Sequence, residues 1–214
     1  RDRSPSRGLG DVYKRQYLYF KEMNVDPKNP KWEDRDRFVL SKGHCCPSLY
    51  AVLALKGYFE WDELTKLRHV GAMLQGHPDM KGTPGIDMST GSLGQGISAA
   101  CGMALSAKIS NKSYRVYSVL GDGEVEEGQV WEAAMFAAHN KLDNLVIFVD
   151  QNGLQIDGTV DEVAGIEPLD KKFESFGFEV FKIDGHDFNQ IEDALNKARE
   201  AVSYTHLTLP TNSL

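Results

Sequence analysis

The chain has 214 residues, 41% of them hydrophobic and 26% charged, and its formal net charge is −7. This length suffices for one domain with a sizeable core but not for two ordinary domains. The acidic balance argues against nucleic acid as a partner, and the lack of a long apolar run argues against a membrane-spanning segment.

The two ends of the chain differ in composition from the middle. Residues 1–16 are rich in Arg, Ser and Gly and show no periodicity, and residues 203–214 carry a Thr/Leu alternation and a proline. Both ends are more typical of translated cloning or adaptor sequence than of native protein, and Asp2 and Asp11 argue against a transit peptide. We therefore expect the native domain to occupy residues 17–202, incomplete at both ends, between two non-native flanks.

The first half of the domain combines helices with a long loop. Cys46–Leu55 predicts an apolar helix that ends before Gly57, and Trp61–His69 predicts a short charged helix. Gly71–Met88 is rich in glycine and proline and predicts a loop of a length that is usually functional or disordered. The small residues of Ser92–Ile109 predict a helix suited to close packing against another backbone.

The second half alternates strands and helices. Arg115–Leu120 and Leu145–Asp150 are short β-rich runs that are typical of buried parallel strands. A helix over Glu124–Asn140 joins them, and a third strand, Glu179–Ile183, precedes a helix over Phe188–Arg199. This order predicts an α/β fold with an open, mostly parallel sheet and helices on both faces.

The first of these strands runs directly into Gly121-Asp122-Gly123. The same three residues could form a hairpin turn, but the residues after them follow a helical pattern rather than that of a returning strand. Glycines before a helix let the backbone approach an anion, and the helix N-terminus supplies N–H donors and the positive end of a dipole. We therefore expect an anion to bind here.

The next strand ends at Asp150 and is followed by Gln151, Asn152 and Gly153. A right-handed crossover makes the two strands parallel, so Asp122 and Asn152 emerge at the same edge of the sheet, where open α/β sheets bind ligands. One carboxylate, one amide oxygen and a nearby carbonyl are hard ligands, and Mg²⁺ commonly takes the rest from phosphates and water. The sequence predicts a Mg²⁺-diphosphate site rather than a zinc or redox site.

Together these motifs resemble the thiamine-diphosphate signature in its transketolase version. The matching residues are Gly121-Asp122-Gly123, Glu127-Gly128, Trp131-Glu132-Ala133, Asn144-Leu145, Asp150 to Asn152 and Ile156-Asp157-Gly158. The resemblance implies metal ligation by Asp122, Asn152 and the Leu154 carbonyl, with Ca²⁺ or Mn²⁺ as possible substitutes for Mg²⁺. It also implies that Gly121, Asp122, Gly123 and Asn152 bind the cofactor.

Three upstream segments extend the resemblance. Arg37 to His44 is similar to the transketolase segment whose histidine contacts the diphosphate and the reacting centre, which implies both roles for His44. Gln75 to Pro78 matches the Gly-His-Pro loop, where the histidine (here His77) hydrogen-bonds substrate. Ser89 to Gly96 matches the cofactor loop.

That cofactor loop contributes through its backbone and one apolar side chain. The resemblance implies that the Gly91 carbonyl holds the aminopyrimidine and that Leu93 supports the bent cofactor. Ser92 stands where we expect proline in many members, and this departure matters little because the contact is made by the backbone.

Two glutamates have two interpretations. Glu127 and Glu132 lie near a helix start, where solvated acidic side chains favour the helix dipole. The resemblance instead places them in a carboxylate network that links two cofactors at a dimer interface. We expect the network role for Glu127, and for Glu132 the two interpretations stay open.

The implied reaction is the transfer of a two-carbon ketol unit from a ketose phosphate to an aldose phosphate, in the non-oxidative pentose phosphate pathway. The glutamate that protonates the aminopyrimidine belongs to another domain of the family. We therefore expect this chain to be an N-terminal half or subunit, inactive without a C-terminal half, and to form a homodimer of the assembly.

Two alternatives remain. One is a related thiamine-diphosphate enzyme such as 1-deoxyxylulose-5-phosphate synthase, against which the pairing of Ser41 to His44 with Gly76 to Pro78 argues. The other is a non-catalytic interaction subunit, which would not need intact Asp122, Asn152, His44 and His77.

The cysteines indicate the compartment. Cys45, Cys46 and Cys101 form no CxxC pair and no disulfide framework, and no secretory signal is visible. We therefore expect reduced cysteines in a cytoplasmic protein.

Overall fold

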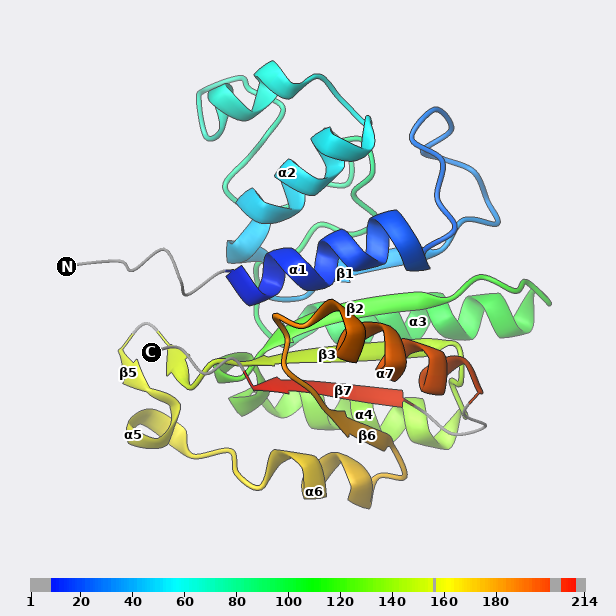
Figure 1. Cartoon of the computed structure of the whole chain (residues 1–214), viewed down its shortest axis with the longest axis vertical. Coiled ribbons are helices and arrows are strands. Elements are labelled where there is room, and N and C mark those ends of the chain that lie inside the picture. The colour runs from blue at the N-terminus through cyan, green and yellow to red at the C-terminus, as the bar shows by residue number, and fades with distance from the viewer. Residues whose placement is uncertain (1–8, 156, 201–204, 211–214) are drawn as a thin grey trace.

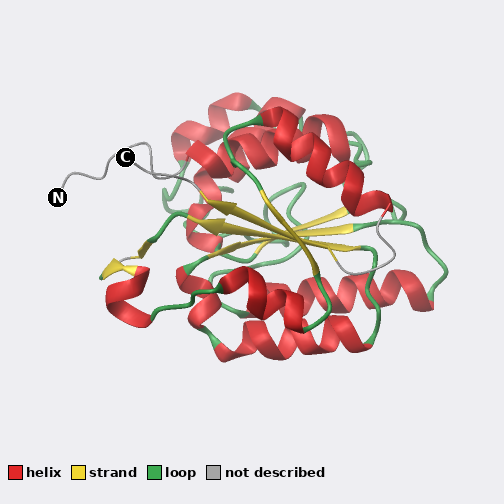
Figure 2. Cartoon of the chain, turned by 60° about the horizontal axis from the view of Figure 1, so that its bottom comes forward, coloured by secondary structure: helices red, strands yellow, loops and turns green. Residues whose placement is uncertain are grey.

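The computed structural model describes residues 9–155, 157–200 and 205–210. Its main sheet has the strand order β1-β2-β3-β7-β6, and all neighbouring strands run parallel. The strands are β1 (Arg37–Leu40), β2 (Val116–Gly121), β3 (Leu145–Gln151), β6 (Glu179–Lys182) and β7 (Thr205–Pro210). Helices cover both faces of the sheet (Figure 1 and Figure 2), which confirms the expected α/β fold.

The remaining elements are helices, short turns and one small antiparallel ribbon. The α-helices are α1 (Leu9–Tyr17), α2 (Cys46–Lys56), α3 (Gln95–Ile109), α4 (Gly128–His139), α5 (Val160–Ala164), α6 (Leu169–Ser175) and α7 (Phe188–Glu200). The turns are η2 (Leu18–Glu22), η3 (Gly43–Cys45), η4 (Trp61–Lys66) and η5 (Gly123–Glu126), and the ribbon pairs β4 (Leu154–Gln155) with β5 (Gly158–Thr159). Across the described residues, no helix is both long and apolar enough to cross a bilayer.

The core has two parts, one on each face of the sheet. Phe38 and Leu40 of β1 join a buried cluster with residues of α2 and α7, whereas Val39 joins a second cluster with residues of α3, α4 and α6. Side chains alternate between the two faces along a strand, so one short strand serves both clusters. Burial on both faces explains why β2 and β3 are almost continuously apolar in sequence.

Two helices differ from expectation. The segment expected to be helical over Trp61–His69 forms only the 3-10 turn η4, because none of its residues is buried and the positive φ of Arg68 (65°) turns the chain. The helix expected over Glu124–Asn140 divides into η5 and α4, because Glu127 between them has an extended conformation, with ψ 126°.

The sheet also contains strands that the sequence did not predict. β1 lies in a strongly charged stretch of sequence, and β7 lies in the segment 203–214 that is expected to be a non-native flank. The structure likewise gives helix α1 to residues of the expected N-terminal flank. Whether the two flanks are native sequence stays a prediction, which the gene sequence on both sides would test.

Helix α3 contains two glycines in opposite surroundings, which gives a matched test of packing. A Cβ on Gly96 would lie 2.6 Å from Ser41 Cα, whereas a Cβ on Gly102 would meet no atom within 4 Å. We expect Gly96→Ala to lower the free energy of unfolding by about 1–3 kcal/mol through overpacking. Gly102→Ala should raise it by about 0.5–1 kcal/mol through helix propensity. Urea unfolding of both variants measures the difference, and equal effects would contradict the close approach of α3 to Ser41.

Candidate functional site

The candidate site lies at the carboxyl ends of β1, β2 and β3, which are adjacent in the sheet (Figure 1). The register pairs Leu40 with Val119 and Gly121 with Asp150, so the three strands deliver their following loops to one edge. This confirms the expectation that parallel pairing brings the Asp122 and Asn152 segments together.

Asp122 is buried, with an exposed fraction of 2%, and its carboxylate joins two loops. Its Oδ1 accepts a hydrogen bond from Gly123 N at 3.0 Å, and its Oδ2 accepts one from Gly153 N at 2.5 Å. Burial raises the pKa of Asp122 above its usual value, although these two bonds favour the ionised form. A cation would relieve this cost, because it would stabilise the carboxylate charge in a site with little water.

Asn152 is held with its amide in one orientation. Its Nδ2 donates to Asp150 Oδ2 at 3.2 Å, and its Oδ1 accepts from Leu154 N at 3.0 Å. The amide oxygen therefore faces the loop that Asp122 contacts.

These oxygens form a mixed donor set. Among the described residues, no three or more His, Cys, Asp or Glu side chains gather in a way that could hold a metal ion. A cation at this edge would therefore bind one carboxylate, one amide oxygen and one backbone oxygen. These are hard ligands that suit Mg²⁺, and phosphate and water would complete its coordination. The residues present fit such an ion.

A buried ion pair lies beneath this loop. Lys42 and Asp150 are 3% and 2% exposed, and Lys42 Nζ contacts Asp150 Oδ2 at 2.6 Å. Lys14 Nζ contacts the other carboxylate oxygen. Burial alone would raise the pKa of Asp150, but the two ammonium groups hold it well below its usual range. The sequence predicts Asp150 as a strand end and as part of the matched signature, but not as an ion-pair partner, because nothing local identifies a partner over a hundred residues away.

The segment that leads to His44 and the loop over residues 89–96 lie next to each other. A Cβ on Gly43 would lie 2.8 Å from Gly91 N, so only glycine allows this approach between the two segments. Thr90 Oγ1 donates to Leu40 O at 2.6 Å and fixes the same contact. His44 follows in η3 with its side chain exposed.

His77 reaches the same loop from the Gly71–Met88 segment. A Cβ on Gly91 would lie 2.8 Å from His77 Cδ2, so the imidazole packs directly on the Gly91 backbone. The Tyr50 hydroxyl lies 2.9 Å from His77 O and 3.0 Å from Gln75 O, which anchors the loop to α2. The histidine side chain is exposed and available to a ligand.

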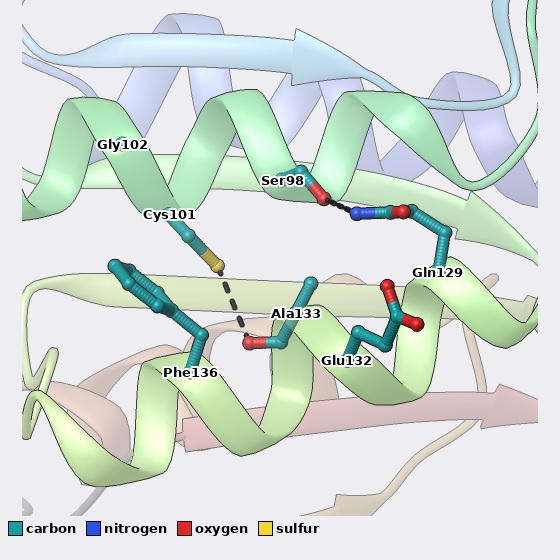
Figure 3. Close-up of a pocket in the computed structure, with 7 residues that line it drawn as sticks. All are labelled: Ser98, Cys101, Gly102, Gln129, Glu132, Ala133 and Phe136. Atoms are coloured by element: carbon teal, nitrogen blue, oxygen red, sulfur yellow. Dashed lines mark hydrogen bonds between the residues drawn. The ribbon is translucent and has the colours of Figure 1, made fainter.

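The two glutamates lie in different surroundings. Glu127 is exposed and lies beside Gly94. A Cβ added to Gly94 would lie 2.9 Å from Glu127 Cβ, so Glu127 borders the 89–96 loop. Glu132 lines a pocket of ≈ 350 Å³ between α3 and α4, with Gln129, Ala133 and Phe136 from α4 (Figure 3). Gln129 Nε2 donates to Ser98 Oγ at 2.6 Å across this pocket. The structure thus brings Glu127 to the strand-end loops and places Glu132 on the outer helix pair.

Comparison with known proteins gives a consistent result. The family described as "Transketolase, thiamine diphosphate binding domain" matches residues 4–209. The chain is 53% identical over 184 residues to the 6-deoxy-6-sulfo-D-fructose transketolase subunit SqwG of Clostridium sp., covering 86% of this chain and 67% of that protein. It is 42% identical to an apulose-4-phosphate transketolase subunit of Phocaeicola vulgatus, covering 88% and 66%.

Longer relatives and solved structures match over the same region. Human transketolase is 44% identical, with 85% of this chain and 29% of that protein covered. The crystal structure of transketolase from Campylobacter jejuni superposes with a TM-score of 0.86 at 30% identity, covering 96% of this chain and 37% of that one. The chain therefore spans about two thirds of the subunit relatives and about a third of the longer enzymes.

Proposed function

Because the chain belongs to the transketolase family, as its thiamine-diphosphate-binding domain, we propose that it is the N-terminal part of an enzyme that transfers a two-carbon ketol unit. The donor would be a ketose phosphate and the acceptor an aldose phosphate, as in the non-oxidative pentose phosphate pathway, in the cytoplasm. The observation that carries this proposal is the hydrogen bond from Gly153 N to Asp122. This bond holds Asp122 against the Asn152–Leu154 loop at the edge where three parallel strands end.

The relatives favour a separate subunit. Two of the relatives are themselves transketolase subunits. The identity of 53% with one of these subunits exceeds the 44% identity with the single-chain human enzyme. We therefore propose that a C-terminal subunit completes the enzyme. From the composition of the two ends, we also propose that the native domain of this chain occupies residues 17–202.

We propose that Mg²⁺ is held by the Asp122 carboxylate, the Asn152 side chain and the Leu154 carbonyl. Gly121, Gly123 and Asn152 would meet the diphosphate. When bound, thiamine diphosphate supplies the reactive carbon and the electron sink for ketol transfer. The task of this chain is then to bind and orient the diphosphate end, and to neutralise its charge with a metal ion and backbone amides rather than with a basic surface.

The 89–96 loop and the two histidines would act on the rest of the ligand. Gly91, Ser92 and Leu93 would contact the aminopyrimidine side of the cofactor. His44 would contact the diphosphate and the reacting centre, and His77 would hydrogen-bond the donor substrate. The packing of His77 on Gly91 supports this assignment, because the imidazole lies beside the loop that would contact the cofactor.

The exposed apolar side chains on the outer face of α3 and α4 are evidence that a second copy of the assembly binds there. Glu132 lies there, and Ile109, Met135 and Phe136 are 72%, 59% and 43% exposed. We propose that this face packs in a homodimer, and that Glu127 belongs to a carboxylate network between the two cofactors. The position of Glu132 on this face favours its membership of the same network.

Replacement of His77 should separate substrate use from cofactor binding. In the enzyme reconstituted with its C-terminal half, we expect His77→Ala to lower kcat/KM for the donor by about tenfold to a thousandfold, as for one or two charge-assisted hydrogen bonds. Cofactor affinity should stay nearly unchanged. His69→Ala is the matched control, since His69 is also exposed and precedes the same loop. A loss confined to cofactor affinity would contradict the role of His77.

A sulfonated ketose is a second candidate donor. The relative at 53% identity is a 6-deoxy-6-sulfo-D-fructose transketolase subunit. This chain is more similar to that subunit than to human transketolase, to which it is 44% identical. Steady-state rates with fructose 6-phosphate and 6-deoxy-6-sulfofructose, measured side by side in the reconstituted enzyme, would decide between the two donors.

A further inference from the structure

The carboxylate of Glu124 occupies a position that no sequence motif singled out. Glu124 lies in η5, two residues after Asp122, and is only 2% exposed. Its Oε1 accepts hydrogen bonds from Ser41 Oγ and from Gly94 N, the latter at 2.9 Å, and its Oε2 accepts one from Gly121 N at 3.2 Å. One buried side chain thus receives three donors.

The three donors come from three segments that are distant in sequence. Ser41 follows β1 and precedes His44, Gly94 lies in the 89–96 loop and is the N-cap of α3, and Gly121 ends β2 beside Asp122. Gly94 has φ 80°, a backbone conformation that favours glycine and that other residues rarely adopt. This conformation directs the Gly94 N–H toward the carboxylate. The carboxylate therefore joins the Ser41–His44 segment, the 89–96 loop and the end of β2 at a single acceptor.

We propose that Glu124 is a positioning residue that fixes the Ser41–His44 segment, the 89–96 loop and the end of β2 in the arrangement that receives thiamine diphosphate. This inference rests on the proposed function and adds a residue to it. Glu124 acts through its neighbours, because its two oxygens are occupied by protein donors and its side chain is shielded from solvent.

The alternative is a carboxylate that merely stabilises the fold. Burial raises the pKa of Glu124 while its hydrogen bonds and the nearby Lys42 favour the ionised form, so the ionised carboxylate is costly to bury. Three hydrogen bonds offset part of this cost, and all three come from the segments that carry the proposed ligand-binding residues. A separate measurement must therefore distinguish loop position from global stability.

Glu124→Gln is the informative substitution because it preserves volume. A glutamine has one acceptor oxygen, so its amide nitrogen must face either Gly121 N or the pair formed by Gly94 N and Ser41 Oγ. In both orientations a backbone N–H loses its acceptor, and the loop that carries it is released. We expect the dissociation constant for thiamine diphosphate, measured with Mg²⁺, to rise roughly 10–100-fold, as for other partners that orient ligand-binding groups.

Asp36→Asn is the matched control. Asp36 is also a buried carboxylate that accepts backbone hydrogen bonds, from Asn24 N at 2.8 Å and Arg115 N at 2.7 Å, but it lies at the opposite edge, where β1 and β2 begin. Burial raises its pKa as well. The Asp36→Asn variant should keep the cofactor affinity of wild type. Ser41→Ala, which removes one of the three donors, should raise the dissociation constant by roughly 2–10-fold and decides the matter if Glu124→Gln does not fold.

The experiment combines two readouts. Hydrogen exchange on the chain should show faster exchange at either the Gly94 amide or the Gly121 amide in Glu124→Gln than in wild type or Asp36→Asn. Calorimetry on the assembly with its C-terminal half should show the weakened cofactor binding in Glu124→Gln alone of the two carboxylate variants. Unchanged exchange and affinity, or an equal loss of affinity in Asp36→Asn, would overturn the inference. A wild-type assembly that binds no thiamine diphosphate would overturn the proposed function instead.

Discussion

Asp122→Asn is expected to abolish Mg²⁺-dependent binding of thiamine diphosphate. The substitution removes the only charged group from the proposed ligand set, and the remaining amide and carbonyl oxygens cannot compensate the charge of a divalent ion held against a diphosphate. Asn152→Ala should have the same effect, because it removes the oriented amide oxygen from the proposed ligand set. Calorimetric titration with and without Mg²⁺ measures both variants in the assembled enzyme.

The same substitution should leave the fold intact. Burial raises the pKa of Asp122, so the ionised carboxylate gives little net stability, and an asparagine oxygen can still accept one of the two backbone bonds. Circular dichroism should therefore match wild type, and Asp36→Asn serves as the control for a buried carboxylate outside the site. Equal Mg²⁺-dependent binding by wild type and Asp122→Asn would rule out the metal assignment.

The chain on its own is expected to show no ketol transfer and to bind the cofactor weakly. Its loops gather the groups that we propose for the diphosphate end, and it spans about a third of the longer transketolases. In the family, the glutamate that protonates the aminopyrimidine belongs to another domain, and formation of the nucleophile requires it. Adding the matching C-terminal half should restore turnover in an assembly with two copies of each half.

Thermal unfolding gives a graded readout of the same prediction. Ligand at about a hundred times its dissociation constant contributes roughly 2.7 kcal/mol, which for a chain of this size shifts Tm by roughly 5–11 °C. We expect that shift only when both halves and Mg²⁺ are present. Robust ketol transfer by this chain alone, in a preparation shown to be free of host enzyme, would refute the split site.

Local sequence was enough to predict that the Asp122 and Asn152 loops meet at one edge of the sheet. Gly121-Asp122-Gly123 follows an apolar run and precedes a helical pattern, and Asn152 follows the next apolar run, so the geometry of a parallel crossover brings them together. The structure confirms this through the bond from Gly153 N to Asp122. The position of Glu127 beside Gly94 required the fold, because no local pattern relates the two.

The groups that hold the loops together could not be predicted in this way. Glu124 contacts Ser41 and Gly94, which lie 83 and 30 positions away, and the Lys42–Asp150 pair spans 108 positions. A glutamate after a glycine near a helix start resembles any solvated acidic side chain in sequence, and only tertiary packing buries it. Strand β1 was missed for a related reason, since its four residues follow a charged stretch and gain their stability from pairing with β2.

A crystal structure of the assembled enzyme with thiamine diphosphate and Mn²⁺ tests the central claim most directly, because Mn²⁺ can be located by its anomalous scattering. We expect one strong peak per copy of this chain, within roughly 2.0–2.6 Å of the Asp122 carboxylate, the Asn152 side-chain oxygen and the Leu154 carbonyl, the range between Mg²⁺ and Ca²⁺ ligand distances. The diphosphate should lie against the same peak. A cofactor and metal ion bound elsewhere, with Asp122 and Asn152 contacting neither, would contradict the proposed site.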